Sequence, residues 1–100
     1  MPKAPLLDES EIGRRLDALP AWERKGDQLV RTVRFADFTE AVAFVSRLVE
    51  PSNGQNHHPD VAIHWNEVTL TLWTHASGGL TERDFRLAAT IDALAPDAGT

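Results

Sequence analysis

All four histidines of this 100-residue chain lie between positions 57 and 75. An imidazole has an unperturbed pKa of about 6.5, so it can donate or accept a proton near neutral pH. Two or more imidazoles at one site can therefore supply both a general acid and a general base. We take His57, His58 and His75 as candidate catalytic residues. The residue types alone leave open that they are surface or hydrogen-bonded structural histidines.

An expected hairpin separates these three histidines from the fourth. Residues 61–65 and 68–74 have the composition of two strands, with a turn near Asn66-Glu67. An antiparallel hairpin brings its two ends to one edge, so His75 should approach the His57-His58 pair. His64 lies near the turn and should be carried away from that edge, where we expect a structural role.

Two neighbouring residues have both a structural and a functional interpretation. Pro59 fixes its own φ and biases His58 toward an extended conformation, which would hold the histidine pair in one direction; it could also simply start a strand. Asp84 is the third residue after Thr81, a spacing that suits a helix N-terminal cap. It can serve as a cap whether or not it contacts a ligand.

Composition excludes several classes of protein. Ten Lys and Arg against fifteen Asp and Glu give a net charge of -5, which opposes attraction to nucleic acid or anionic lipid. The chain has no cysteine for a disulfide or a thiolate metal site. No stretch approaches the roughly 20 apolar residues of a membrane span. We expect a cytoplasmic protein that binds neither nucleic acid nor membrane.

A histidine-bound metal is a further possibility that the sequence does not favour. Three imidazoles are sufficient ligands for a zinc ion in some enzymes. However, no carboxylate stands at a familiar ligand spacing such as H-E-x-x-H. We therefore expect no metal.

The hydrophobic period changes along the chain in a regular order. The expected elements are a helix that ends at Pro20, a hairpin over 21–35 with its turn at 25–27, a helix from Asp37 to a break at Pro51, a polar loop over 52–56, the second hairpin, and a helix from Thr81 with Phe85, Ala88, Ile91 and Leu94 on one side. This α-β-β-α-β-β-α order has no long crossovers. It predicts an α+β fold in which helices cover one face of a four-stranded antiparallel sheet.

The other face of that sheet needs a cover. In the last strand Val68, Leu70 and Leu72 share one face, so Thr71 and Trp73 fall on the other. A second copy of the chain could cover that open face. We therefore expect a homodimer or homotetramer.

The motifs around the histidines resemble those of the pterin-4a-carbinolamine dehydratase family. They are the string Asn56-His57-His58-Pro59-Asp60 and, after the hairpin, Thr74-His75-Ala76-Ser77-Gly78-Gly79-Leu80-Thr81-Glu82-Arg83-Asp84. The resemblance implies one domain of that family over residues 1–100. It also implies dehydration of 4a-hydroxytetrahydrobiopterin to quinonoid dihydropterin plus water, in the recycling of tetrahydrobiopterin, without a metal or organic cofactor.

The resemblance also implies roles for particular residues. His57, His58 and His75 would be catalytic, and Asp84 would be an active-site carboxylate. Trp22 matches a tryptophan near the pterin, although it could equally be a core residue. We favour His58 and His75 as acid candidates and His57 as the base or ring anchor, but the residues leave this assignment open.

One position departs from the family pattern, and one alternative function follows from the family itself. The family often has an acidic residue four positions before the first histidine of the pair, where this chain has Asn53. The resemblance implies that Asn53 and Pro59, with Asp84 and Trp22, bind the substrate. An amide can hydrogen-bond a pterin but cannot support a neighbouring imidazolium as a carboxylate would, so we expect activity to be reduced.

Family members also act as a dimerisation cofactor of a transcription factor, and relatives without the histidines act as assembly factors. A non-catalytic binding protein is therefore the alternative.

Overall fold

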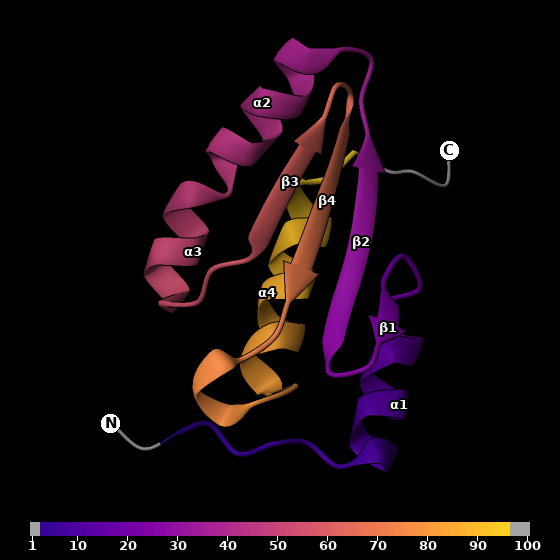
Figure 1. Ribbon diagram of the computed structural model, residues 1–100, viewed down its shortest axis with the longest axis vertical. Coiled ribbons are helices and arrows are strands. Elements are labelled where there is room, and N and C mark those ends of the chain that lie inside the picture. Colours follow the sequence, from indigo (N-terminus) through magenta and orange to yellow (C-terminus); the bar gives the residue numbers. More distant parts are fainter. Residues whose placement is uncertain (1–2, 97–100) are drawn as a thin grey trace.

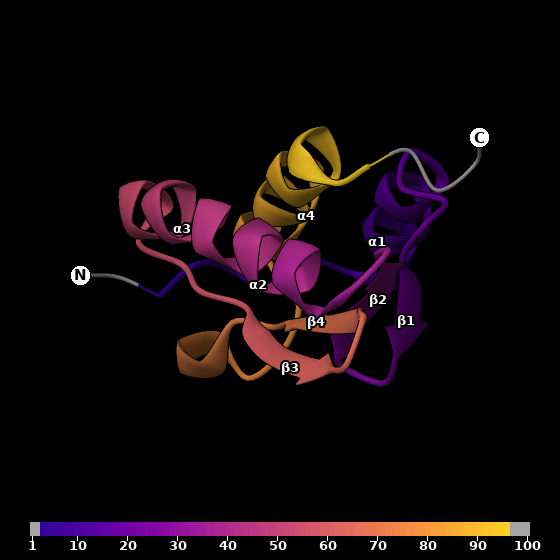
Figure 2. The same ribbon diagram turned by 90° about the horizontal axis from the view of Figure 1, so that it is seen from above.

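The computed structural model describes residues 3–96 and shows a four-stranded antiparallel sheet with all four α-helices on one face (Figures 1 and 2). The elements are α1 (Glu9–Asp17), β1 (Glu23–Lys25), β2 (Gln28–Arg34), α2 (Phe38–Arg47), α3 (Val49–Gln55), β3 (Asp60–His64), β4 (Glu67–Leu72), the short 3-10 helix η1 (His75–Ser77) and α4 (Glu82–Leu94). The predicted α+β class is confirmed.

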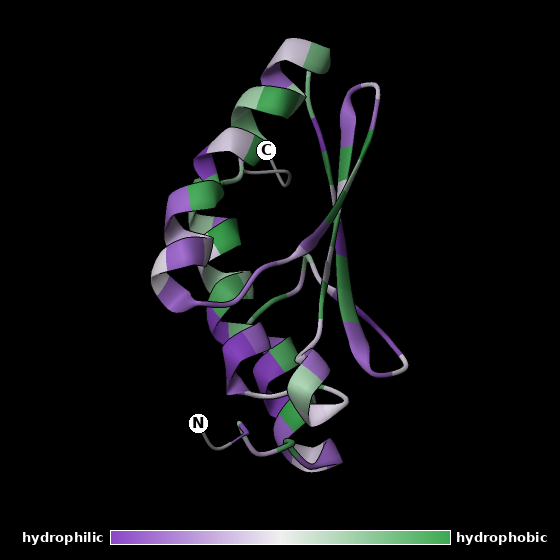
Figure 3. Cartoon of the chain, turned by 60° about the vertical axis from the view of Figure 1, so that its left-hand side comes forward, coloured by the Kyte–Doolittle hydropathy of each residue, from purple (hydrophilic) through white to green (hydrophobic). Residues whose placement is uncertain are grey.

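The strand order in the sheet is β1-β2-β4-β3, so the two hairpins meet through β2 and β4. In this central pair Leu29 lies opposite Leu72, and Val33 lies opposite Val68. All four side chains are buried and pack with Phe44 of α2 in the core. Figure 3 shows hydrophobic residues on the sides of the helices that face the sheet. The predicted alternation along β4 is confirmed, and the sheet's polar face is the one without helices.

Side-chain caps start three of the helices, because the first backbone N–H groups of a helix have no intrahelical partner. Asp8 accepts a hydrogen bond at the start of α1, and Asp37 does so at the start of α2. At α4, Thr81 accepts from the backbone of Arg83 while Asp84 accepts from the backbone of Thr81. This is the capping box predicted for Thr81 and Asp84.

The predicted end of the second helix at Pro51 was wrong. The helix bends at Leu48, and α3 continues through Pro51 to Gln55. Pro51 is the third residue of α3, where a backbone N–H would have no intrahelical acceptor, so the proline is tolerated. Asn56, with φ of 51°, ends the helix in the left-handed conformation. Asn53 therefore lies on a helix and not in a loop.

The turn of the second hairpin also differs from the prediction. It lies at Trp65-Asn66, one residue earlier than expected, and Glu67 already belongs to β4. Trp65 has a positive φ of 54° and an exposed side chain. The side chain of Asn66 donates to the carbonyl of Phe35 and so ties this turn to the end of β2.

The open face of the sheet includes Thr71, as the alternation along β4 predicted. It carries polar pairs such as Thr32 with Thr69, whose hydroxyls lie 3.1 Å apart. Several exposed apolar side chains lie at the free edge of the sheet and on the neighbouring helices, namely Val61 and Ile63 of β3, Phe38 and Val42 of α2 and Val49 of α3; Leu6 and Trp65 are exposed elsewhere. No helix of the described part combines the length and the apolar character needed to cross a membrane.

Candidate active site

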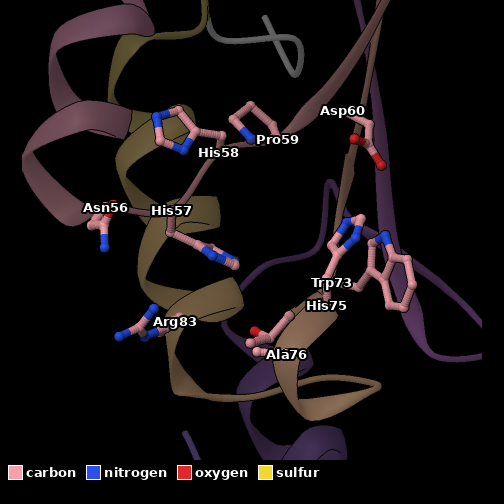
Figure 4. Close-up of a pocket in the computed structure, with 10 residues that line it drawn as sticks. Asn56, His57, His58, Pro59, Asp60, Trp73, His75, Ala76 and Arg83 are labelled. Atoms are coloured by element: carbon pink, nitrogen blue, oxygen red, sulfur yellow. The ribbon is translucent and has the colours of Figure 1, made fainter. Parts of the chain in front are cut away.

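A cavity of about 370 Å³ lies where the second hairpin opens (Figure 4). It is lined by Asn56, His57, His58, Pro59, Asp60, Trp73, Thr74, His75, Ala76 and Arg83. These residues come from the segment between α3 and β3, from the end of β4, from η1 and from the first turn of α4. The structure thus brings together the three candidate histidines, and it leaves His64 at the other end of the hairpin.

His57 is held by a buried carboxylate. Its Nε2 lies 2.6 Å from Oδ1 of Asp84, whose side chain has no exposed surface. A carboxylate accepts hydrogen bonds, so Nε2–H of His57 is the donor, and within residues 3–96 the Nδ1 atom of His57 has no hydrogen-bond partner and can accept a proton. Asp84 is therefore both a helix cap and the hydrogen-bond partner of a candidate catalytic residue, so its structural and functional interpretations are compatible.

The other oxygen of Asp84 accepts two more hydrogen bonds. One comes from Oγ1 of Thr74 at 2.9 Å and the other from the backbone N–H of Thr81 at 2.9 Å. The two threonine hydroxyls also lie 2.8 Å apart. A buried charge needs such donors, because each missing one leaves the ion poorly solvated. The network fixes the carboxylate, and through it the imidazole of His57.

His58 has a different partner. Its Nε2 lies 2.9 Å from Oδ1 of Asn53 on α3, and because an amide oxygen only accepts, the imidazole donates. Asn53 does not line the cavity itself but a neighbouring apolar groove of about 180 Å³ that shares His58 and Pro59. Asn53 was expected to contact substrate; in the structure it contacts the cavity residue His58 and lines the groove next to the cavity.

His75 begins η1, three residues after β4 ends at Leu72. Its ring packs against the indole of Trp73, with ring centroids 3.9 Å apart and the planes tilted by 32°. The alternation along the last strand placed Trp73 on the open face of the sheet, but Trp73 was not among the predicted site residues. Its position two residues before His75, at the end of the strand, was the signal that could have identified it.

Trp22 lies elsewhere. Its side chain is buried, and Nε1 donates to Oδ1 of Asp92 at 2.8 Å. Asp92 also pairs with the buried Arg31 of β2. Asp92 follows the cavity residue Arg83 by about 14 Å along α4, at 1.5 Å per residue. The structure therefore places Trp22 in the core and not at the cavity.

Two charged residues complete the cavity, and sequence reasoning missed both. Asp60 begins β3, and Arg83 lies in the first turn of α4. Both belong to the two motifs that carry the family resemblance, which was the available signal. Within residues 3–96, no three His, Cys, Asp or Glu side chains gather in a way that would hold a metal ion.

Comparison with known proteins gives one consistent result. The sequence profile of a family described as "Pterin 4 alpha carbinolamine dehydratase" matches residues 5–94. A protein of Trichormus variabilis, provisionally named a pterin-4-alpha-carbinolamine dehydratase, is 47% identical over 91 residues, which cover 91% of this chain and 98% of the relative. A protein of Thermomicrobium roseum with the same provisional name is 49% identical over 89 residues, which cover 89% and 96% of the two chains.

Two solved structures are also similar. The crystal structure of a "transcriptional coactivator/pterin dehydratase" from Brucella melitensis superimposes with a TM-score of 0.86 at 32% identity, covering 91% of this chain and 99% of that one. A pterin dehydratase-like protein, described as a RuBisCO assembly factor in the alpha-carboxysome, gives a TM-score of 0.61 at 26% identity over 77% of this chain and 89% of that one.

Proposed function

This chain belongs to the pterin 4 alpha carbinolamine dehydratase family, and on that basis we propose that it dehydrates 4a-hydroxytetrahydrobiopterin, a pterin-4a-carbinolamine, to quinonoid dihydropterin. The product would then be returned to tetrahydrobiopterin by a reductase. The observation that carries the proposal is the grouping of His57, His58 and His75 around one cavity, with His57 on the buried carboxylate of Asp84.

The reaction requires two proton transfers. A general acid protonates the hydroxyl on C4a, and the C4a–O bond breaks as water leaves. The lone pair of N5 forms the C4a=N5 double bond, and a general base accepts the N5 proton. The acid donates one proton and the base accepts one, and no atom changes its net oxidation level. Acid-base groups are therefore sufficient for the reaction. We therefore propose that neither a metal nor an organic cofactor takes part.

The hydrogen bonds around the cavity support a division of roles. When Nδ1 of His57 accepts a proton, the ring becomes an imidazolium whose charge the adjacent Asp84 carboxylate stabilises. His57 is therefore the proposed base. His58, bonded to the neutral Asn53, and His75 are the proposed acids at the C4a hydroxyl. Pro59 lines the same cavity and keeps the two adjacent histidines in an extended segment.

We further propose that the protein acts in the cytoplasm as a homodimer or homotetramer. β3 is an edge strand whose five residues are all exposed, and its Val61 and Ile63 add apolar area next to the unpaired backbone. Such an edge is a ready site for antiparallel pairing with a second copy. The net charge of -5 argues against nucleic acid as a direct partner.

The second candidate function is a non-catalytic binding or assembly protein with this fold. It is favoured by the likeness to the protein described as a RuBisCO assembly factor and by the exposed apolar edge of β3. A scaffold has no use for three imidazoles gathered at one open cavity, one of them oriented by a buried carboxylate. For that reason we place catalysis first.

Stopped-flow absorbance of 4a-hydroxytetrahydropterin dehydration separates the two candidates. The wild-type protein should accelerate the reaction over buffer alone, and His75→Ala should remove most of that acceleration. If wild type does not exceed buffer but Asn53→Glu does, the natural protein is the binding protein and Asn53 is the reason.

A further inference from the structure

Each of the three cavity histidines contacts a different orienting side chain. His57 is held by Asp84 and His58 by Asn53, in both cases through Nε2. The His75 ring makes no hydrogen bond to any residue in the described part of the chain, and its close partner is the indole of Trp73.

The position of Trp73 explains this contact. Trp73 directly follows β4 and continues the alternation of Thr69 and Thr71, so its side chain leaves on the open face of the sheet. The chain then turns into η1, which places the His75 ring over the half-buried indole. In Figure 4 the indole lies on the side of His75 that is turned away from His57. Trp73 thus packs behind the ring of His75, on the side away from His57.

We propose that Trp73 is a positioning residue that holds the imidazole of His75 toward the cavity for proton transfer. The inference rests on the proposed dehydratase function. Without the indole, His75 would sit exposed on a three-residue 3-10 helix with no other described contact to fix its side-chain torsions. A ring that is free to rotate is seldom in the reactive geometry, and small misplacements of a catalytic group are costly to rate.

A stacked indole suits this task better than a hydrogen-bonding partner would. It contacts the face of the imidazole, so both Nδ1 and Nε2 of His75 remain available for proton exchange. The electron-rich face of an indole is attractive to a neutral aromatic ring and to a cation alike. The ring can therefore stay in place in both protonation states, through a complete catalytic cycle.

The test compares Trp73→Leu and Trp73→Phe with a matched control, Trp65→Leu. Trp65 is the exposed tryptophan at the opposite end of the same hairpin and does not line the cavity. We expect Trp73→Leu to lower kcat about tenfold or more while KM stays within about twofold, because the group lost orients an acid without binding substrate. Trp73→Phe keeps an aromatic face and should recover most of kcat, and Trp65→Leu should match wild type.

A second readout does not depend on activity. In the proton NMR spectrum, the ring current of Trp73 should shift the C–H signals of His75 upfield, with His75→Gln identifying those signals. The shift should disappear in Trp73→Leu and persist in Trp65→Leu. Trp73→Leu with wild-type kcat, or with an increased KM and unchanged kcat, would overturn the positioning role. So would His75 signals that do not move in Trp73→Leu.

The two proposals fail in distinguishable ways. If the wild-type protein does not accelerate dehydration, the proposed function fails, whatever the spectra show. Suppose that wild type is active but Trp73→Phe, which retains an aromatic ring, is as slow as a folded Trp73→Leu. Then stacking on an aromatic ring is not what positions His75, and this inference alone fails.

Discussion

Oδ1 of Asp84 lies 2.6 Å from Nε2 of His57, and neither side chain is open to solvent: Asp84 has no exposed surface and His57 is 9% exposed. The same carboxylate caps α4 through the backbone of Thr81. One residue thus caps the start of α4 and orients the imidazole of His57 at the cavity. Changes at Asp84 should affect both the stability of the protein and its catalytic rate.

Asp84→Asn should lower kcat by about 10²-fold or more, because an amide cannot stabilise the imidazolium of His57 as a carboxylate does. It should also lower the urea midpoint, since an amide placed there is poorly matched to three donors. Asp92→Asn is the control. It alters a hydrogen-bonded carboxylate on the same helix away from the cavity, so it should change the urea midpoint but not kcat. Wild-type kcat in Asp84→Asn would refute the assignment of Asp84.

His58→Ala and His75→Ala should each reduce the dehydration rate by about 10²-fold or more, within the range for lost acid-base groups. Both positions are exposed, so the far-UV circular dichroism should not change. His64→Ala should retain the wild-type rate, because the hairpin carries His64 away from the cavity. Full activity in both cavity variants, or a large loss at His64, would show that the site has been assigned to the wrong residues.

Asn53→Glu should extend activity to higher pH than in wild type. A carboxylate at this position would face Nε2 of His58, where the neutral amide oxygen now accepts a hydrogen bond 2.9 Å long. An opposite charge nearby favours the protonated imidazole. The check is the pH profile of kcat for wild type, Asn53→Glu and the isosteric Asn53→Asp. Profiles that coincide would mean that His58 is not an acid in the reaction.

The edge of β3 should control assembly. Val61→Lys with Ile63→Lys places two charges on the exposed edge strand, a change that opposes strand pairing. The wild-type protein should be a dimer or tetramer by light scattering, and the double variant a monomer. Thr32→Lys places a similar charge on the open sheet face. If Thr32→Lys dissociates the oligomer and the β3 variant does not, then the second copy covers the open face.

The ion pair between Glu9 and Arg24 should make stability depend on pH. Both carboxylate oxygens of Glu9 accept from the guanidinium of Arg24, and this hydrogen bonding holds the pKa of Glu9 below its ordinary value of 4.5. A carboxyl group with a lowered pKa adds stability above its unfolded pKa and loses it as pH falls through the folded one. Glu9→Gln should therefore have a lower urea midpoint than wild type at pH 7.

That difference should shrink below about pH 4.5 and disappear once Glu9 is protonated in the folded protein. The effect should be small, because Glu9 and Arg24 are at the surface and water screens the pair. Midpoints at pH 7, 5 and 3 give the result. A difference that is the same at all three values would show that the charge of Glu9 does not contribute.

Local patterns in the sequence were sufficient for the order of the four strands and of helices α1, α2 and α4, and for much of the site. The alternation of Val68, Leu70 and Leu72 depends only on the two-residue period of a strand, and the Thr81–Asp84 capping box depends on a spacing of three. That His75 returns to the His57-His58 pair follows from hairpin geometry. Such features depend on residues that are close in sequence, so they can be predicted without knowledge of the tertiary structure.

Tertiary structure decided which side chains hold the histidines. Asn53 meets His58 only because α3 continues past Pro51, where a proline in the first turn removes no helical hydrogen bond. Trp22 joins Asp92 in the core instead of the cavity because Asp92 lies about 14 Å along α4 from the cavity residue Arg83. These contacts join residues that are distant in sequence or depend on where a helix ends. The sequence alone therefore determines which residues can do the chemistry, and packing determines which partners position them.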